Sequence, residues 1–122
     1  MKFAIIGTGG VGGYFGGLLA RSGEDVTFVA RGEHYQVLRQ KGLTLKTVEE
    51  SFENFPVSVV DSVEKLDRPE VIFVSTKTYD RDHVSEQLAR VATSQTTIIP
   101  IQNGIENDIR IKEIVPQARV YP

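Results

Sequence analysis

The chain has 122 residues, of which 40% are hydrophobic and 25% charged, and its formal net charge at pH 7 is −2. This composition is typical of one globular domain, and the slightly acidic balance argues against a nucleic-acid-binding protein, which needs a basic surface. The absence of cysteine excludes disulfides and thiolate metal ligands, and we expect no metal site. No run approaches the roughly 20 apolar residues of a membrane span. Glycines between 7 and 17 interrupt any signal-peptide core, so we expect a cytoplasmic location.

The hydrophobic pattern of the first thirty residues changes from a continuous strand-like run to the spacing of a helix. Phe3–Ile6 is an apolar run with the length of a buried parallel strand. After the glycine-rich segment 7–12, helical spacing of apolar residues predicts a helix that Gly23 caps, and 25–30 is expected to form a second strand. The predicted buried stripe of the helix consists of Val11, Tyr14, Phe15, Leu18 and Leu19. The order strand, glycine turn, helix, strand is that of a dinucleotide-binding unit.

The glycine-rich turn fits the chemistry of a pyrophosphate site. A pyrophosphate binds where the free amide groups and the positive dipole end of a helix N-terminus face the anion. Gly7 is expected to permit the tight turn, Gly9 to let the backbone approach the phosphates, and Gly12 to let the helix lie close to the sheet. The alternative is a glycine-rich turn before an ordinary helix, but the strand on each side favours the dinucleotide site. The predicted cofactor-binding residues of this segment are Gly7, Thr8, Gly9, Gly10, Val11 and Gly12.

The end of the second predicted strand indicates which dinucleotide binds. NAD sites usually carry Asp or Glu here, which accepts hydrogen bonds from the ribose 2′-hydroxyl. This chain has Ala30 followed by Arg31, whose planar guanidinium pairs with phosphate oxygens and can stack on adenine. We therefore predict NADP(H) as the cofactor, with Arg31 at its 2′-phosphate. The alternatives are that Arg31 is a solvated arginine at a strand end, or that Glu33 reaches a ribose hydroxyl instead.

Smaller elements are predicted between residues 34 and 68. In chain order they are one or two helical turns at 34–40, a peripheral hairpin at 42–46 and 49–55, a third core strand at 57–60 and a short helix at 61–68. Val63 and Leu66 are expected to face the core. The acidic residues around Glu49 are interpreted as a solvated edge.

Residues 71–74 form a second strongly apolar strand pattern, and the polar segment Ser75–Asp80 follows it. Ligands of doubly wound sheets bind outside the carboxyl ends of the strands, so function is expected here. Thr76 and Lys77 are predicted to contact the cofactor, and Lys77 is a candidate catalytic residue as a cation over the nicotinamide or an anionic substrate. The alternative for Lys77 is a surface lysine whose stem packs on the protein.

A helix is predicted after this segment, capped by Asp80 and running to about residue 92. His83, near its start, is expected to be solvated. The predicted buried face of the helix consists of Val84, Leu88, Val91 and Ala92.

The last part of the chain repeats the pattern of strand, polar end and helix. A strand is predicted at 97–101, a helix at 105–115 that Pro116 ends, and the start of a last strand at 118–121. Asn103 follows the strand and precedes the helix, so it is expected to cap the helix or to bind a ligand. It is a second candidate catalytic residue and a candidate cofactor contact.

These elements predict an α/β fold: a Rossmann-type doubly wound, mostly parallel sheet with a peripheral hairpin, formed by residues 1–122 as one domain. Reduction of a carbonyl by hydride needs a proton donor. Neither His34 nor His83 lies at a predicted strand carboxyl end, which leaves Lys77 as the only candidate donor in the sequence. We therefore expect residues 1–122 to be the N-terminal part of a longer enzyme and to be inactive alone.

Three segments and the stretch Val29–Gly32 resemble the N-terminal NADPH-binding domain of the ketopantoate reductase (2-dehydropantoate 2-reductase) family. The segments are Ile5–Tyr14, Ser75–Asp80 and Ile101–Gly104. The resemblance implies that the glycine turn and Arg31 bind NADPH, and that Lys77 and Asn103 line the nicotinamide and substrate end. It also implies that a catalytic lysine and a substrate-binding glutamate lie in a helical C-terminal domain absent from this chain.

Three functions stay open at the level of sequence. The first is the cofactor half of a reductase that converts 2-dehydropantoate to pantoate, on the route to pantothenate and coenzyme A. The second is a related NADP-dependent hydroxy-acid or nucleotide-sugar dehydrogenase with the same fold. The third is a non-catalytic NADP-binding sensor. In the first two, the partners are a small-molecule substrate, a 2-oxo acid in the first, and the C-terminal domain of the same polypeptide, with neither nucleic acid nor membrane.

Overall fold

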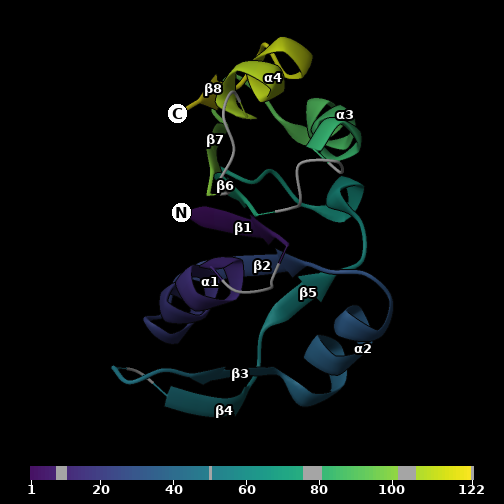
Figure 1. Cartoon of the computed structure of the whole chain (residues 1–122). Helices are drawn as coiled ribbons and strands as arrows, with labels where there is room; N and C mark the ends of the chain where they lie inside the picture. Colours follow the sequence, from purple (N-terminus) through teal and green to yellow (C-terminus); the bar gives the residue numbers. More distant parts are fainter. Residues whose placement is uncertain (8–10, 50, 76–80, 102–106, 122) are drawn as a thin grey trace.

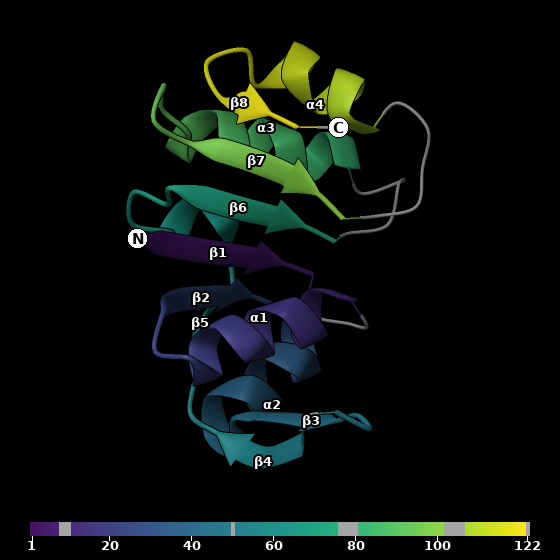
Figure 2. The same cartoon turned by 90° about the vertical axis from the view of Figure 1, so that its left-hand side faces the viewer.

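Six parallel strands form the main sheet of the computed structural model, which describes residues 1–7, 11–49, 51–75, 81–101 and 107–121. In chain order they are β1 (Lys2–Ile6), β2 (Asp25–Val29), β5 (Ser58–Val60), β6 (Val71–Val74), β7 (Thr97–Pro100) and β8 (Arg119–Val120). Their order in space is β5-β2-β1-β6-β7-β8, and each neighbouring pair is parallel, so the arrows in Figure 2 point the same way. The strand order reverses between β1 and β6, which confirms the predicted doubly wound fold.

Helices cover both faces of the sheet. They are α1 (Val11–Arg21), α2 (Gly32–Lys41), α3 (Arg81–Val91) and α4 (Asn107–Ile114), with a 3₁₀ turn, η1 (Val63–Lys65), before β6. Figure 1 shows α1 and α3 on opposite faces. Within the residues described, no helix is long and apolar enough to cross a membrane.

The two faces carry separate hydrophobic cores. Ile6 of β1 belongs to the core beneath α3, α4 and η1, whereas its neighbour Ile5 belongs to the core beneath α1 and α2. Ile5 is 0% exposed and Ile6 3% exposed, as the alternation of side chains along a strand requires when both faces are covered. The apolar runs at 3–6 and 71–74 are therefore buried on both sides.

The face of α1 that packs on the sheet is made of glycine, which differs from the predicted apolar stripe. The buried residues among those whose burial is described are Gly12, Gly13, Gly16 and Gly17. A Cβ atom at Gly16 would lie 2.6 Å from the Phe28 ring and 2.8 Å from Ile5. Phe15, expected in the stripe, is 46% exposed. Close approach of helix and sheet thus takes precedence over burial of the larger side chains.

The helix end and the strand that follows agree with the sequence. Gly23 has a φ of +94°, its N–H donates to the carbonyl of Ala20 at 3.1 Å, and the N–H of Glu24 donates to Leu19 at 3.1 Å. This pair of bonds is a Schellman cap, in which the left-handed residue is usually glycine. The predicted cap and the start of β2 at Asp25 are confirmed.

The predicted hairpin is present as a separate antiparallel pair, β3 (Leu43–Lys46) and β4 (Ser51–Phe55). It lies beside α1: a Cβ atom at Gly17 would be 3.0 Å from Leu43 and 3.2 Å from Phe52. The guanidinium of Arg21 lies 5.1 Å from the centre of the Phe52 ring. Glu53 pairs with Lys46 at 3.3 Å on the exposed edge of the hairpin.

Two predicted helices differ in length from those observed. The segment 61–68 contains only the single turn η1, although Val63 and Leu66 are buried as expected. Leu66 is already extended, and the proline at 69 disfavours helical backbone at Arg68, whose φ is +46°. Conversely, α2 extends over ten residues where one or two turns were expected.

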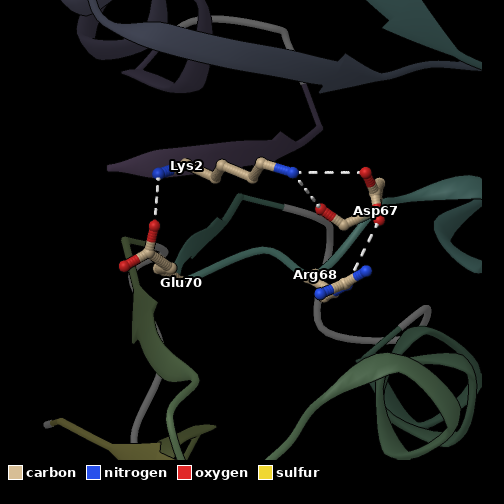
Figure 3. Close-up of polar contacts among 4 residues, drawn as sticks. All are labelled: Lys2, Asp67, Arg68 and Glu70. Atoms are coloured by element: carbon tan, nitrogen blue, oxygen red, sulfur yellow. Dashed lines mark hydrogen bonds and ion pairs between the residues drawn. The ribbon is translucent and has the colours of Figure 1, made fainter.

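The amino edge of the sheet is tied together by internal polar contacts (Figure 3). The backbone N–H of Lys2 donates to the Glu70 carboxylate at 2.9 Å, and its ammonium pairs with Asp67 at 3.2 Å. The buried hydroxyl of Thr96 donates to the carbonyl of Pro69 at 3.2 Å and accepts from the N–H of Thr93 at 2.9 Å. These contacts fix the turns that precede β6 and β7.

Candidate functional site

The turn after β1 lies against the start of α1 at the carboxyl edge of the sheet. Gly7 has a φ of +84°, which permits the sharp turn out of the strand. A Cβ atom at Gly12 would lie 2.1 Å from the Gly7 carbonyl oxygen and 3.2 Å from the Ser75 Cβ. The first turn of α1 thus sits close to the ends of β1 and β6. The tight turn predicted at Gly7 and the close approach predicted at Gly12 are both present. Val11 is the first residue of α1, whereas Thr8, Gly9 and Gly10 lie outside the described residues.

Arg31 follows β2 at the same edge. It has extended backbone and precedes the first residue of α2, and its side chain is exposed. Ala30 donates its N–H to the Val60 carbonyl of β5 at 3.1 Å, which fixes the backbone immediately before Arg31. Glu33, the sequence alternative, is exposed in the first turn of α2.

A cavity of about 270 Å³, here called the carboxyl-edge cavity, opens beside Gly7 and Arg31. The described residues that line it are Ile6, Gly7, Val29, Arg31, Val63, Val84 and Gln87. They come from the ends of β1 and β2, from η1 and from α3. The cavity therefore brings Gly7 and Arg31, which are 24 positions apart in sequence, into one site with apolar walls.

Gln87 was not predicted. It lies on α3 one turn after Val84, and its Oε1 atom is buried with no hydrogen-bond partner in the part of the chain that the structure describes. Sequence contains a signal for it, because Gln87 lies one turn after Val84 and one turn before Val91, two residues of the predicted buried face. A polar residue at such a position is unusual and calls for a partner.

An ion pair joins α3 to α4 near the same edge. Arg110 donates from Nε and Nη2 to the two carboxylate oxygens of Asp82 at 3.1 and 3.0 Å. This bidentate bond with the Asp82 carboxylate raises the pKa of the Arg110 guanidinium above its ordinary value.

Several predicted residues lie outside the described residues. They are Thr76, Lys77, Asp80 and Asn103, from segments 76–80 and 102–106. Their segments connect β6 to α3 and β7 to α4, the two helices that the ion pair between Asp82 and Arg110 joins.

Other hollows and titratable groups are less suited to a dinucleotide. A hollow of about 440 Å³ lies at the amino edge, where Lys2, Arg68 and Glu70 line it. It is larger than the carboxyl-edge cavity, but doubly wound sheets bind ligands at the opposite edge, and its Lys2 and Glu70 bond to each other. His34 and His83 are exposed. Among the residues with described positions, no three His, Asp or Glu side chains gather as metal ligands.

Comparison with known proteins agrees with this geometry. The model of the family described as ketopantoate reductase PanE/ApbA matches residues 3–122. The chain belongs to this family. The match covers nearly the whole chain, so it confirms the resemblance seen in the sequence motifs. The ketopantoate reductases are oxidoreductases.

Individual ketopantoate reductases match the chain along most of its length. A 2-dehydropantoate 2-reductase of Pyrococcus horikoshii is 34% identical over 116 residues, which are 93% of this chain and 36% of that protein. One from Nostoc sp. is 30% identical over 119 residues, 98% of this chain and 37% of that protein. The crystal structure of a PanE/ApbA family ketopantoate reductase from Ralstonia eutropha JMP134 superposes with a TM-score of 0.91 at 28% identity, covering 98% of this chain and 40% of that one. The chain thus spans well under half the length of these relatives.

Proposed function

We propose that this chain is the NADPH-binding domain of a 2-dehydropantoate 2-reductase, which forms pantoate on the route to pantothenate and coenzyme A. Membership of the family and the names of its relatives support this proposal. The observation that carries it is the position of Arg31, at the end of β2 and in one cavity with Gly7. Ala30 replaces the carboxylate that would repel a 2′-phosphate.

The residues at the carboxyl edge fit a dinucleotide. The absence of a side chain at Gly12 lets the N-terminus of α1 lie against the turn after β1, where its amide groups attract a pyrophosphate. The carboxyl-edge cavity, at about 270 Å³, lies just below the roughly 300–1,000 Å³ of complete ligand pockets, so it suits one end of the molecule. Arg31 would hold the 2′-phosphate. NADPH, when bound, supplies the hydride.

The substrate end is proposed from the sequence motifs. Lys77 would place its ammonium near the carboxylate of a 2-oxo acid, and Asn103 would orient the substrate or the ribose through its amide. We propose that a C-terminal domain, in a longer polypeptide of the kind that the relatives represent, supplies the proton donor. These 122 residues then bind NADPH without reducing the substrate.

Cofactor preference tests the role of Arg31. Calorimetric titration of the chain should give tighter binding of NADP⁺ than of NAD⁺, by about tenfold or more for a charge-assisted contact. Arg31→Ala should remove most of this preference by weakening NADP⁺ alone. Arg119→Ala, an exposed arginine at the amino end of β8, is the matched control and should leave both affinities unchanged. Equal weakening of both cofactors by Arg31→Ala would contradict the proposal.

Substrate specificity is tested on the polypeptide extended to the length of its relatives. Oxidation of NADPH in the presence of 2-dehydropantoate should be followed by absorbance, with other 2-oxo acids in parallel. Preference for 2-dehydropantoate supports pantoate formation. Preference for another oxo acid would favour a related hydroxy-acid dehydrogenase, and cofactor binding without any turnover would favour a sensor.

A further inference from the structure

We propose that Gln87 recognises the side of the adenine ring that carries the 6-amino group and N7, an inference that rests on the proposed function. Oε1 of Gln87 is buried without a hydrogen-bond partner in the described ranges, and the residue lines the carboxyl-edge cavity. A buried acceptor without a partner is destabilising, so a group that donates to it on binding gains more than it would from a solvated amide.

The surroundings of Gln87 restrict the kind of ligand. Four of the other described lining residues are aliphatic, namely Ile6, Val29, Val63 and Val84. Gln87 and Arg31 supply the two polar side chains among the described lining residues, one an amide and the other a cation. Aliphatic walls with one amide suit a flat heterocycle that carries a hydrogen-bond donor, and the cation suits a phosphate attached to it. An adenosine 2′-phosphate has both features.

Amide chemistry then selects adenine among the bases. A glutamine amide matches the N6 and N7 atoms of adenine, because Oε1 accepts from the 6-amino group while Nε2 donates to N7. Hypoxanthine carries an oxygen in place of the 6-amino group, so it would present an acceptor to Oε1. Gln87 is therefore proposed to discriminate in favour of a 6-aminopurine, whereas Arg31 discriminates in favour of the 2′-phosphate.

Ser85 differs from Gln87 in a way that supports this assignment. Its hydroxyl is also buried without a partner in the described part of the molecule, and it lies two positions earlier on α3. It is not among the residues that line the cavity. A ligand in the cavity would thus lie beside Gln87 and away from Ser85, and the Gln87 side chain would turn its amide toward the ligand.

The test compares NADP⁺ with its hypoxanthine analogue, in which a 6-oxo group replaces the 6-amino group and N1 carries a hydrogen, whereas N7 is the same. Calorimetry on the unmodified chain should give binding of NADP⁺ tighter by about tenfold, within the range for a bidentate contact to a base. Gln87→Met keeps the length of the side chain but cannot form the amide hydrogen bonds, so the ratio of the two affinities should fall close to one. Gln36→Met, on the exposed surface of α2, is the matched control and should keep it.

The outcomes separate this inference from the proposed function. Equal affinity of the unmodified chain for the two dinucleotides, with NAD⁺ still weaker, would overturn the role of Gln87 and leave the proposed function intact. Failure of every dinucleotide to bind would overturn both. Thermal unfolding without ligand supplies a second readout. Gln87→Met should not lower the Tm, because it replaces a buried acceptor that has no partner among the described residues, and a large drop would indicate a structural role instead.

Discussion

At the scale of single residues, the glycines of α1 determine how closely the helix approaches the sheet. A Cβ atom at Gly16 would face the Phe28 ring and Ile5 of the adjacent strands at less than 3 Å, whereas one at Gly17 would face the ends of the Leu43 and Phe52 side chains of the hairpin at 3.0 and 3.2 Å. Both positions would gain up to about 1 kcal/mol of helix propensity from alanine. The difference in the free energy of unfolding between an alanine variant at Gly16 and one at Gly17 therefore measures packing alone.

Gly16→Ala should destabilise the chain and Gly17→Ala should be close to neutral. At Gly16 the new Cβ would meet Phe28 at 2.6 Å, an overpacking that costs about 1–3 kcal/mol and exceeds the gain in propensity. At Gly17 the closest contact would be 3.0 Å from the end of Leu43, which can rotate away. Urea unfolding of both variants measures the difference, and equal stabilities would show that α1 can move away from the sheet.

At the scale of elements, the turn between α3 and β7 depends on one buried hydroxyl. Thr96 is 1% exposed, and its side chain joins the N–H of Thr93 to the carbonyl of Pro69. The pair of bonds links this turn to the segment before β6. The hydroxyl of Thr93 makes a similar bond, at 3.1 Å to the N–H of Gln95, but that residue is exposed to water.

Thr96→Val should lower the free energy of unfolding by about 1–3 kcal/mol, because the isosteric side chain leaves two backbone groups without their partner. Thr93→Val is the matched control and should cost much less, since water can replace the lost bond. Thermal and urea unfolding measure both. A Thr93→Val variant as unstable as Thr96→Val would mean that burial does not decide the effect.

The elements also show where local sequence is informative. The apolar runs at 3–6 and 71–74 predicted β1 and β6 correctly, because a strand that is covered on both faces is apolar at every position. The buried face of α1 could not be found from hydrophobicity, since glycine carries no apolar signal and the fit to Phe28 is a tertiary property. The segment 61–68 has an adequate helical pattern, but Leu66 is already extended after one turn, and the proline at 69 disfavours helical backbone at the residue before it.

At the scale of the whole molecule, the two edges of the sheet are built differently. The amino edge is closed by internal bonds, such as that from Lys2 to Glu70 (Figure 3). The carboxyl edge combines a glycine turn, an exposed Arg31 and the buried oxygen of Gln87, which has no hydrogen-bond partner among the described residues. Sequence motifs predicted Gly7, Gly12 and Arg31 at this edge. The helical pattern places Gln87 one turn after the buried Val84, but its contact with the cavity could not be predicted, because that contact depends on how α3 packs. The roles of Lys77 and Asn103 stay predictions.

The central claim is that a dinucleotide binds at the carboxyl edge of the sheet. Titration of the isotope-labelled chain with NADP⁺, followed through its backbone amide NMR signals, tests this most directly. We predict shifts concentrated at Gly7, Arg31 and Gln87, with the signals of Lys2 and Glu70 unchanged. Shifts concentrated at Lys2 and Glu70, or none at saturating NADP⁺, would contradict the account.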